Sequence, residues 1–121
     1  MLRGKPASNP VAVPESSPWP GGETAFGTTE RAAGIRFYRA KESFFRPYVL
    51  LRAMALAEGQ LTFVFADDEV VVQGRGLHVA YAAAAEGRLA WLGEQGERFA
   101  AAGSGPVGII RIELVPLRDR G

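Results

Sequence analysis

The sequence predicts an α+β domain in which one helix packs on one face of a small antiparallel sheet of four to five strands. Three observations predict this class. Strand-forming runs at 61–66 and 70–72 flank an acidic turn, a stretch from residue 76 has helical periodicity, and residues 107–115 alternate apolar and charged side chains. The length of 121 residues suits a single domain.

The first part of the chain differs in composition from the rest. Five of the eight prolines lie there, together with several glycines: Pro6, Pro10, Pro14, Pro18 and Pro20. Such a segment buries too little apolar surface to offset the entropy lost on ordering. We therefore predict a disordered Pro/Gly-rich N-terminal leader at 1–32, a single α+β domain at 33–117 and a tail at 118–121.

The overall composition narrows the class of protein. Hydrophobic residues make up 47% of the chain, cysteine is absent, and the formal net charge is +1. A chain without cysteine has no disulfide, thiolate metal ligand or thiol nucleophile. The small net charge gives no general attraction to nucleic acid or an anionic membrane. The sequence has neither a signal-peptide core nor a run of ~20 apolar residues, so we expect a cytoplasmic protein without membrane association. Only Lys5 and Lys41 of the fourteen basic residues are lysines, and this bias towards arginine, with that towards alanine and glycine, indicates a GC-rich bacterial genome.

The first two expected strands precede the acidic turn. Residues 35–39 alternate imperfectly and indicate a short strand. The segment 47–58 fits either a strand or a helix, because Pro47 suits a first helical turn and Gly59 suits a helix stop. We favour a strand, since a compact turn at Gly59 would fold it back on 61–66 as an antiparallel hairpin.

One helix is expected to begin at residue 76. Its apolar positions recur at the spacing of one helix face: Leu77, Tyr81, Ala84 and Ala85. The helix either ends at residue 86 or continues to about residue 100. We favour an end near Glu86 with Gly87 as a left-handed cap, because each interior glycine costs ~1 kcal/mol. An extended segment at 89–92 and a loop at 100–106 follow.

The last expected strand has one dry and one solvated face. Ile110, Ile112 and Leu114 are expected on one side, and Arg111 and Glu113 on the other. We expect this final strand to offer an edge on which another chain can pair.

The sequence offers few groups for catalysis. His78 is the only histidine, and no nucleophile-elbow pattern surrounds a serine. The adjacent acids at 67–69 lack the alternate spacing and central glycine of a calcium loop, so we interpret them as a solvated turn. We therefore expect no enzymatic activity, no metal site and no cofactor.

The sharpest ligand hypothesis concerns the junction between the second hairpin strand and the helix. A glycine-rich turn before a helix N-terminus presents backbone N–H groups and a positive dipole end to an anion. The residues of this candidate anion-binding site are Gly74, Arg75, Gly76 and His78. The pattern lacks the dinucleotide fingerprint and the P-loop lysine, so the alternative is that the glycines only let the chain turn.

A second ligand hypothesis concerns nucleic acid. Residues 31–57 contain six basic residues and one acid, interleaved with aromatics, whereas 58–69 contains four acids and no base. The contrast fits either pairing between strands or a platform for single-stranded nucleic acid. The candidate residues within 31–52 are Arg36, Phe37, Tyr38, Arg39, Arg46 and Arg52.

These features together favour a non-enzymatic protein-interaction or self-association module. A domain of this size buries only somewhat more than ~60% of its unfolded surface, so it is marginal as a monomer. The expected partner is another protein or a second copy in a homodimer. Nucleic-acid binding through 31–52, and a small-anion or nucleotide site of a sensor or enzyme at Gly74–Gly76, are the alternatives.

Overall fold

The computed structural model describes residues 24–96 and 107–117. Eight strands, one α-helix and one 3-10 helix follow one another along this part of the chain. In order they are β1 (Phe26–Thr28), β2 (Gly34–Tyr38), β3 (Ser43–Pro47), η1 (Tyr48–Leu50), β4 (Leu51–Ala57), β5 (Gln60–Phe65), β6 (Asp68–Arg75), α1 (Leu77–Ala85), β7 (Leu89–Gly93) and β8 (Gly108–Pro116).

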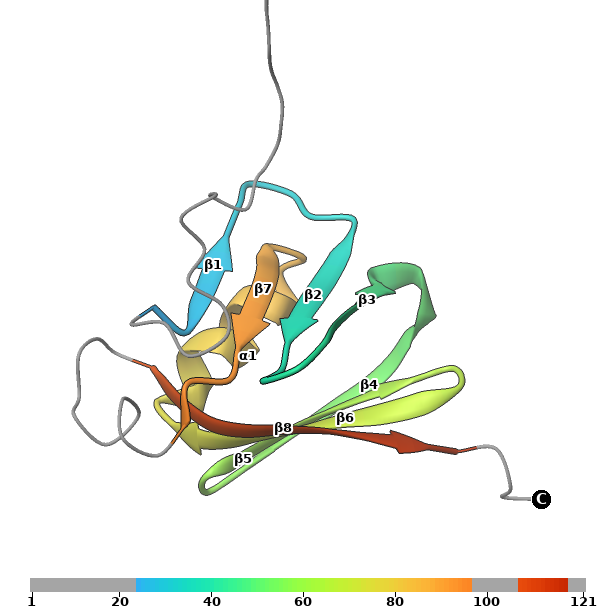
Figure 1. Ribbon diagram of the computed structural model, residues 1–121. Coiled ribbons are helices and arrows are strands. Elements are labelled where there is room, and N and C mark those ends of the chain that lie inside the picture. Colours follow the sequence, from blue (N-terminus) through green and yellow to red (C-terminus); the bar gives the residue numbers. More distant parts are fainter. Residues whose placement is uncertain (1–23, 97–106, 118–121) are drawn as a thin grey trace, which may run out of the picture.

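The strands form two four-stranded sheets, so the prediction of a single sheet of four to five strands is wrong. Sheet A has the order β1-β7-β2-β3, and sheet B has the order β4-β5-β6-β8. Neighbouring strands are antiparallel except β2 and β7, which are parallel. Figure 1 shows sheet A above sheet B, with α1 beside them. The α+β class is confirmed.

The hairpins of sheet B form where the sequence predicts them. Leu61, Phe63 and Phe65 alternate inward along β5, and Val70 and Val72 do so along β6, all at most 1% exposed. The segment 47–58 is mainly strand, because η1 leads into β4 and a two-residue turn then returns the chain to β5. The preference for a strand over a helix is confirmed.

Glycines delimit α1 at both ends. Gly76 precedes the helix at φ 67° and Gly87 follows it at φ 73°, both in the left-handed region that favours glycine. The predicted end near Glu86 is therefore confirmed. The buried residues of α1 are Leu77, Ala80 and Ala84, whereas Ala85 of the predicted face is exposed. The expected loop at 100–106 lies outside the described residues.

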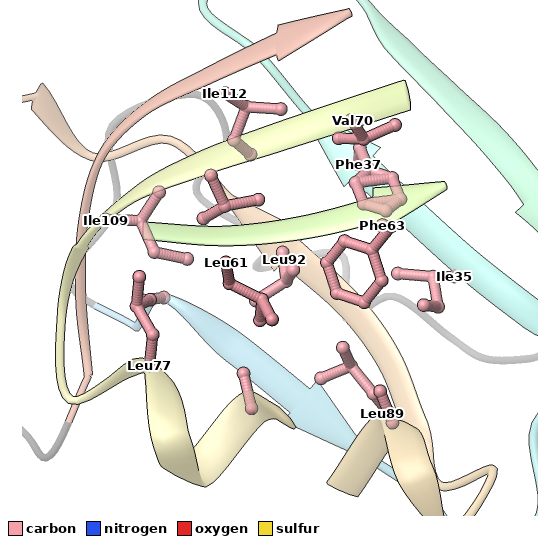
Figure 2. Packing of buried hydrophobic residues seen from close by; sticks show 14 of the residues in the cluster. Ile35, Phe37, Leu61, Phe63, Val70, Leu77, Leu89, Leu92, Ile109 and Ile112 are labelled. Carbon is pink, nitrogen blue, oxygen red and sulfur yellow. The ribbon is translucent and has the colours of Figure 1, made fainter. Parts of the chain in front are cut away.

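The core joins the two sheets through aromatic contacts. The ring centroid of Phe37 on β2 lies 5.2 Å from that of Phe44 on β3 and 5.5 Å from that of Phe63 on β5. Figure 2 shows Phe37 and Phe63 among the buried aliphatic side chains, with Leu77 of α1 in the same cluster. Both sheets and the helix thus share one hydrophobic core.

The alternation along β8 is interrupted by a bulge. The register of β6 and β8 shifts between Gln73 and Gly74, which leaves Ile110 as the extra residue of β8. Ile109 and Ile112 are consequently buried, whereas Ile110 is 40% exposed. The predicted inward position of Ile110 is wrong, because the bulge reverses the alternation.

Strand β1 lies inside the segment assigned to the leader. It pairs with β7, and the amides of Thr29 and Ala32 donate hydrogen bonds to the carbonyls of Arg88 and Gly87 at 2.9 Å. Three residues are too few for periodicity to reveal a strand. The rest of the predicted leader, 1–23, and the tail at 118–121 lie outside the described residues.

Candidate functional site

The four predicted anion-site residues come together where β6 meets α1. Gly74 and Arg75 end β6, Gly76 caps α1, and His78 is exposed in its first turn. They border an open hollow of about 370 Å³, whose lining residues also include Leu56, Ala57, Glu58, Gly59 and Leu77.

Local contacts give these glycines structural roles. The amide of Gly74 donates to the Gly59 carbonyl at 3.1 Å, so it is already engaged within the fold. A Cβ on Gly74 would lie 2.0 Å from the carbonyl oxygen of Gly108, which explains the glycine as a site of close backbone approach. Glu58 adds an acidic group to the same hollow as Arg75. Anion binding stays a prediction, with less support than the sequence suggests.

The six nucleic-acid candidates do not form one surface. Arg36 is exposed on β2, while its neighbour Phe37 is fully buried in the core. Phe37 therefore cannot stack on a base, and its assignment to a nucleic-acid site is wrong. Tyr38 packs edge-on against Trp91 at 5.9 Å, and burial raises its pKa. Arg52 lies on β4, in the other sheet.

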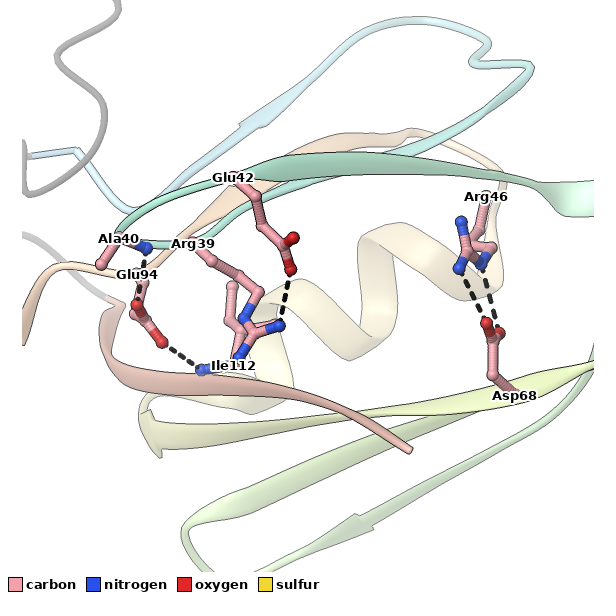
Figure 3. A network of polar contacts seen from close by, with 7 residues as sticks. All are labelled: Arg39, Ala40, Glu42, Arg46, Asp68, Glu94 and Ile112. Carbon is pink, nitrogen blue, oxygen red and sulfur yellow. Dashed lines mark hydrogen bonds and ion pairs between the residues drawn. The ribbon is translucent and has the colours of Figure 1, made fainter. Parts of the chain in front are cut away.

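Two of the candidate arginines are held by acids. Arg46 on β3 forms a bidentate pair with Asp68 on β6, with Nε 3.2 Å from Oδ1 and Nη2 2.7 Å from Oδ2 (Figure 3). Arg39 pairs with Glu42 at 2.7 Å. Asp68 is only 9% exposed, so its predicted place in a solvated turn is wrong. Part of the charge contrast along the chain thus reflects pairing between the sheets.

The outer edge of β8 is partly closed. The Glu94 carboxylate accepts hydrogen bonds from the amides of Ile112 at 2.8 Å and Ala40 at 2.9 Å (Figure 3). The Gln95 side chain accepts from the Ile109 amide at 2.9 Å, and the Gln95 amide donates to the Ile109 carbonyl at 2.8 Å. The final strand therefore lacks the continuous edge that we expected. No local pattern marks Glu94 or Gln95 for this role.

Strand β4 forms the opposite edge of sheet B. Its one strand neighbour among the described residues is β5. From Ala53 to Ala57 the strand contains no charged residue and no proline, and its pairing with β5 is regular, whereas Arg52 and a register shift between Leu51 and Ala53 lie at its start. Five of the seven residues of β4 are exposed: Arg52, Ala53, Ala55, Leu56 and Ala57.

The pairing across sheet B identifies the backbone groups at this edge. Leu56, Leu61, Val72 and Ile112 form one row of directly paired residues. The Ile112 amide points away from β6 towards Glu94. Val72 and Ile112 are therefore a non-hydrogen-bonded pair, so Val72 directs its N–H and C=O towards Leu61 on the other side. Leu61 in turn directs its own groups towards Val72, which leaves the N–H and C=O of Leu56 pointing out of the sheet.

The next row on the same face of sheet B places a second residue of β4 with its backbone groups pointing outward. It contains Met54, Phe63, Val70 and Leu114, two residues along from the first row. The N–H and C=O of Met54 therefore point out of the edge as those of Leu56 do. Two residues of β4 thus present four backbone groups for pairing.

The comparisons with known proteins identify no relative. No protein-family model, curated protein or solved structure matches the chain. Within residues 24–96 and 107–117, no three His, Asp or Glu side chains are grouped so that they could hold a metal ion. The same part of the chain contains no helix with the length and hydropathy of a membrane span.

Proposed function

We propose that the chain is a non-enzymatic protein-association module that takes up an extended polypeptide strand at the edge of β4. One observation carries the proposal: β4 is a seven-residue, exposed edge with outward backbone groups at Met54 and Leu56. An added strand would satisfy these groups by main-chain hydrogen bonds, the mode known as β-strand addition.

Side chains at the edge favour an apolar partner strand. Met54 and Leu56 pair with the buried residues Phe63 and Leu61, so their side chains lie on the inner face of sheet B. Leu56 is nonetheless 41% exposed and borders the hollow beside Leu77. A partner with apolar residues at alternate positions would cover this surface.

The nucleic-acid and anion alternatives have weaker support. A single-strand platform needs aromatic faces and unpaired cations on one surface. Phe37 is buried, and Arg39 and Arg46 are paired with acids. At the candidate anion site, the Gly74 amide already donates a hydrogen bond to the Gly59 carbonyl, and the Glu58 carboxylate in the same hollow would repel a negative ligand.

Peptide selection tests the proposal and does not require the partner to be identified first. Selection of random nine-residue peptides on the immobilised full chain is expected to enrich sequences with alternating apolar residues. A selected peptide should shift the amide resonances of Met54 and Leu56 most strongly. Met54→Pro removes one outward N–H without touching the ladder to β5, so it should weaken peptide binding about tenfold.

A matched pair of lysine variants controls for charge and exposure. Leu56 and Val115 are 41% and 40% exposed on the two opposite edge strands of sheet B. Leu56→Lys should abolish peptide binding, and Val115→Lys should leave it unchanged. Equal effects of the two variants, or resonance shifts centred away from β4, would show that β4 is not the binding edge.

A further inference from the structure

We infer that the strand added to β4 is β4 of a second copy, antiparallel about a two-fold axis at Ala55. The inference rests on the proposed use of this edge and adds the identity of the partner strand. It follows from the order of backbone groups, charges and small side chains along Leu51–Ala57 and the adjoining Glu58.

The register about Ala55 uses both outward-facing residues of the edge. It places Met54 of each copy directly opposite Leu56 of the other. Since both residues direct N–H and C=O out of the sheet, each of the two symmetry-related pairs exchanges two hydrogen bonds. The register of β4 and β5 shifts between Leu51 and Ala53, so the alternation does not continue to Arg52. Pairing centred on Met54 would therefore give one such exchange, between the two Met54 residues.

The charges at the ends of β4 favour the same register. Arg52 and Glu58 are exposed, and neither forms an ion pair with another residue within 24–96 or 107–117. In the register about Ala55, Arg52 at the start of β4 in each copy lies next to Glu58, which follows β4, in the other. A parallel arrangement in register would place like charges together, which is unfavourable.

Small side chains permit close approach on the outer face. Ala53, Ala55 and Ala57 pair with Val64, Thr62 and Gln60, residues of β5 that are not buried. In the dimer Ala55 meets Ala55 of the second copy, and Ala53 meets Ala57. The contact is isologous and would join two copies of sheet B into one eight-stranded sheet.

Cysteine scanning tests the register directly, because the natural chain contains no cysteine. Ala55→Cys should form a disulfide-linked dimer under copper-phenanthroline oxidation, since directly opposed residues lie within disulfide range. Ala53→Cys alone should not, because its own copies would lie about 13 Å apart along the strands. A mixture of Ala53→Cys and Ala57→Cys chains should cross-link.

Charge reversal tests the antiparallel direction in solution. By sedimentation equilibrium, Arg52→Glu and Glu58→Arg should each weaken dimerisation about tenfold, since each replaces two attractive pairs by two repulsive ones. The double variant should recover to within about threefold of the natural chain. Arg111→Glu on β8 is the matched control and should have no effect.

The results separate this inference from the proposed function. A chain that stays monomeric to ~1 mM and does not cross-link through Ala55→Cys overturns the dimer. Selected peptides that still bind at Met54 and Leu56 in that case leave the proposed function standing. Failure of both assays overturns both. Cross-linking of Ala53→Cys alone as fast as Ala55→Cys overturns the register.

Discussion

Individual polar side chains tie the two sheets of this protein together. Arg46 of sheet A and Asp68 of sheet B form a bidentate pair with side-chain exposures of 24% and 13%. The Arg46 guanidinium also lies over the ring of Phe44, with its carbon 4.9 Å from the ring centroid. The Tyr48 hydroxyl donates a 2.7 Å hydrogen bond to the Leu89 carbonyl.

Asp68→Ala is expected to destabilise the fold by about 2 kcal/mol, because it leaves the half-buried Arg46 without its counter-ion. Urea unfolding of the two chains measures the difference. Glu42→Ala, which removes the exposed partner of Arg39, is the control and should cost less than about 0.5 kcal/mol. Equal losses would show that the Arg46–Asp68 pair is no stronger than a surface pair.

Tyr48 gives the protein a specific dependence on alkaline pH. Burial raises its pKa from 10.0 to about 12. Between pH 10 and pH 12 the unfolded chain loses the phenolic proton while the folded chain retains it. The contribution of Tyr48 to the free energy of unfolding is therefore complete below pH 10 and falls as the pH rises towards 12. Tyr48→Phe should cost about 1 kcal/mol at neutral pH through the lost hydrogen bond.

The stability difference between the natural chain and Tyr48→Phe should narrow from pH 10 to pH 12. Urea unfolding at intervals across this range measures the difference, and the other tyrosines cancel in the comparison. A constant difference would mean that Tyr48 ionises equally in both states.

The two edge strands of sheet B differ in whether side chains bind their outward-facing amides. The Glu94 carboxylate joins the turn between β2 and β3 to the edge of β8 through the amides of Ala40 and Ile112. No described residue makes a corresponding side-chain bond to the outward amides of β4. Of the two edges of sheet B, β4 is therefore the more open to a further strand.

Glu94→Ala should expose the amides of Ile112 and Ala40 without unfolding sheet B. Hydrogen exchange measured by NMR should show faster exchange at these two amides, while that of Val72 in the centre of the sheet stays protected. Unchanged protection at Ile112 would mean that another group closes the edge of β8.

The whole molecule is expected to unfold as one unit because its two sheets share a core. Phe63 of sheet B contacts Phe37 of sheet A and lies beside Phe65. Phe63→Leu should lower the free energy of unfolding of the whole chain by about 1–2 kcal/mol. Amide protection in β2 and β5 should fall by the same factor, as two-state unfolding requires. A loss of amide protection that is confined to β5 would show that the two sheets unfold separately.

Association through β4 would extend sheet B beyond one chain. The apolar surface at Leu56 and the charges of Arg52 and Glu58 lie at this boundary of the monomer. Burial there would add to the core of a domain that is small for its surface. The fold and the proposed association thus depend on the same sheet.

The sequence by itself determined the local elements. Gly76 and Gly87 mark the ends of α1, and alternation from Leu61 to Val72 marks the central hairpin. A strand over 51–57 is favoured for a similar reason, because a compact turn at Gly59 returns it to β5. Backbone dihedral preferences and one-sided burial act over a few residues, so a single sequence reveals them.

Only the tertiary structure decided which strands are neighbours and which edges are covered. The division into two sheets, the pairing of Arg46 with Asp68, and the closure of β8 by Glu94 all join residues distant in the chain. Whether β4 lies at an edge depends on the same long-range arrangement. Periodicity identifies a strand and its buried face, but the partner of that strand is set by packing of the whole core.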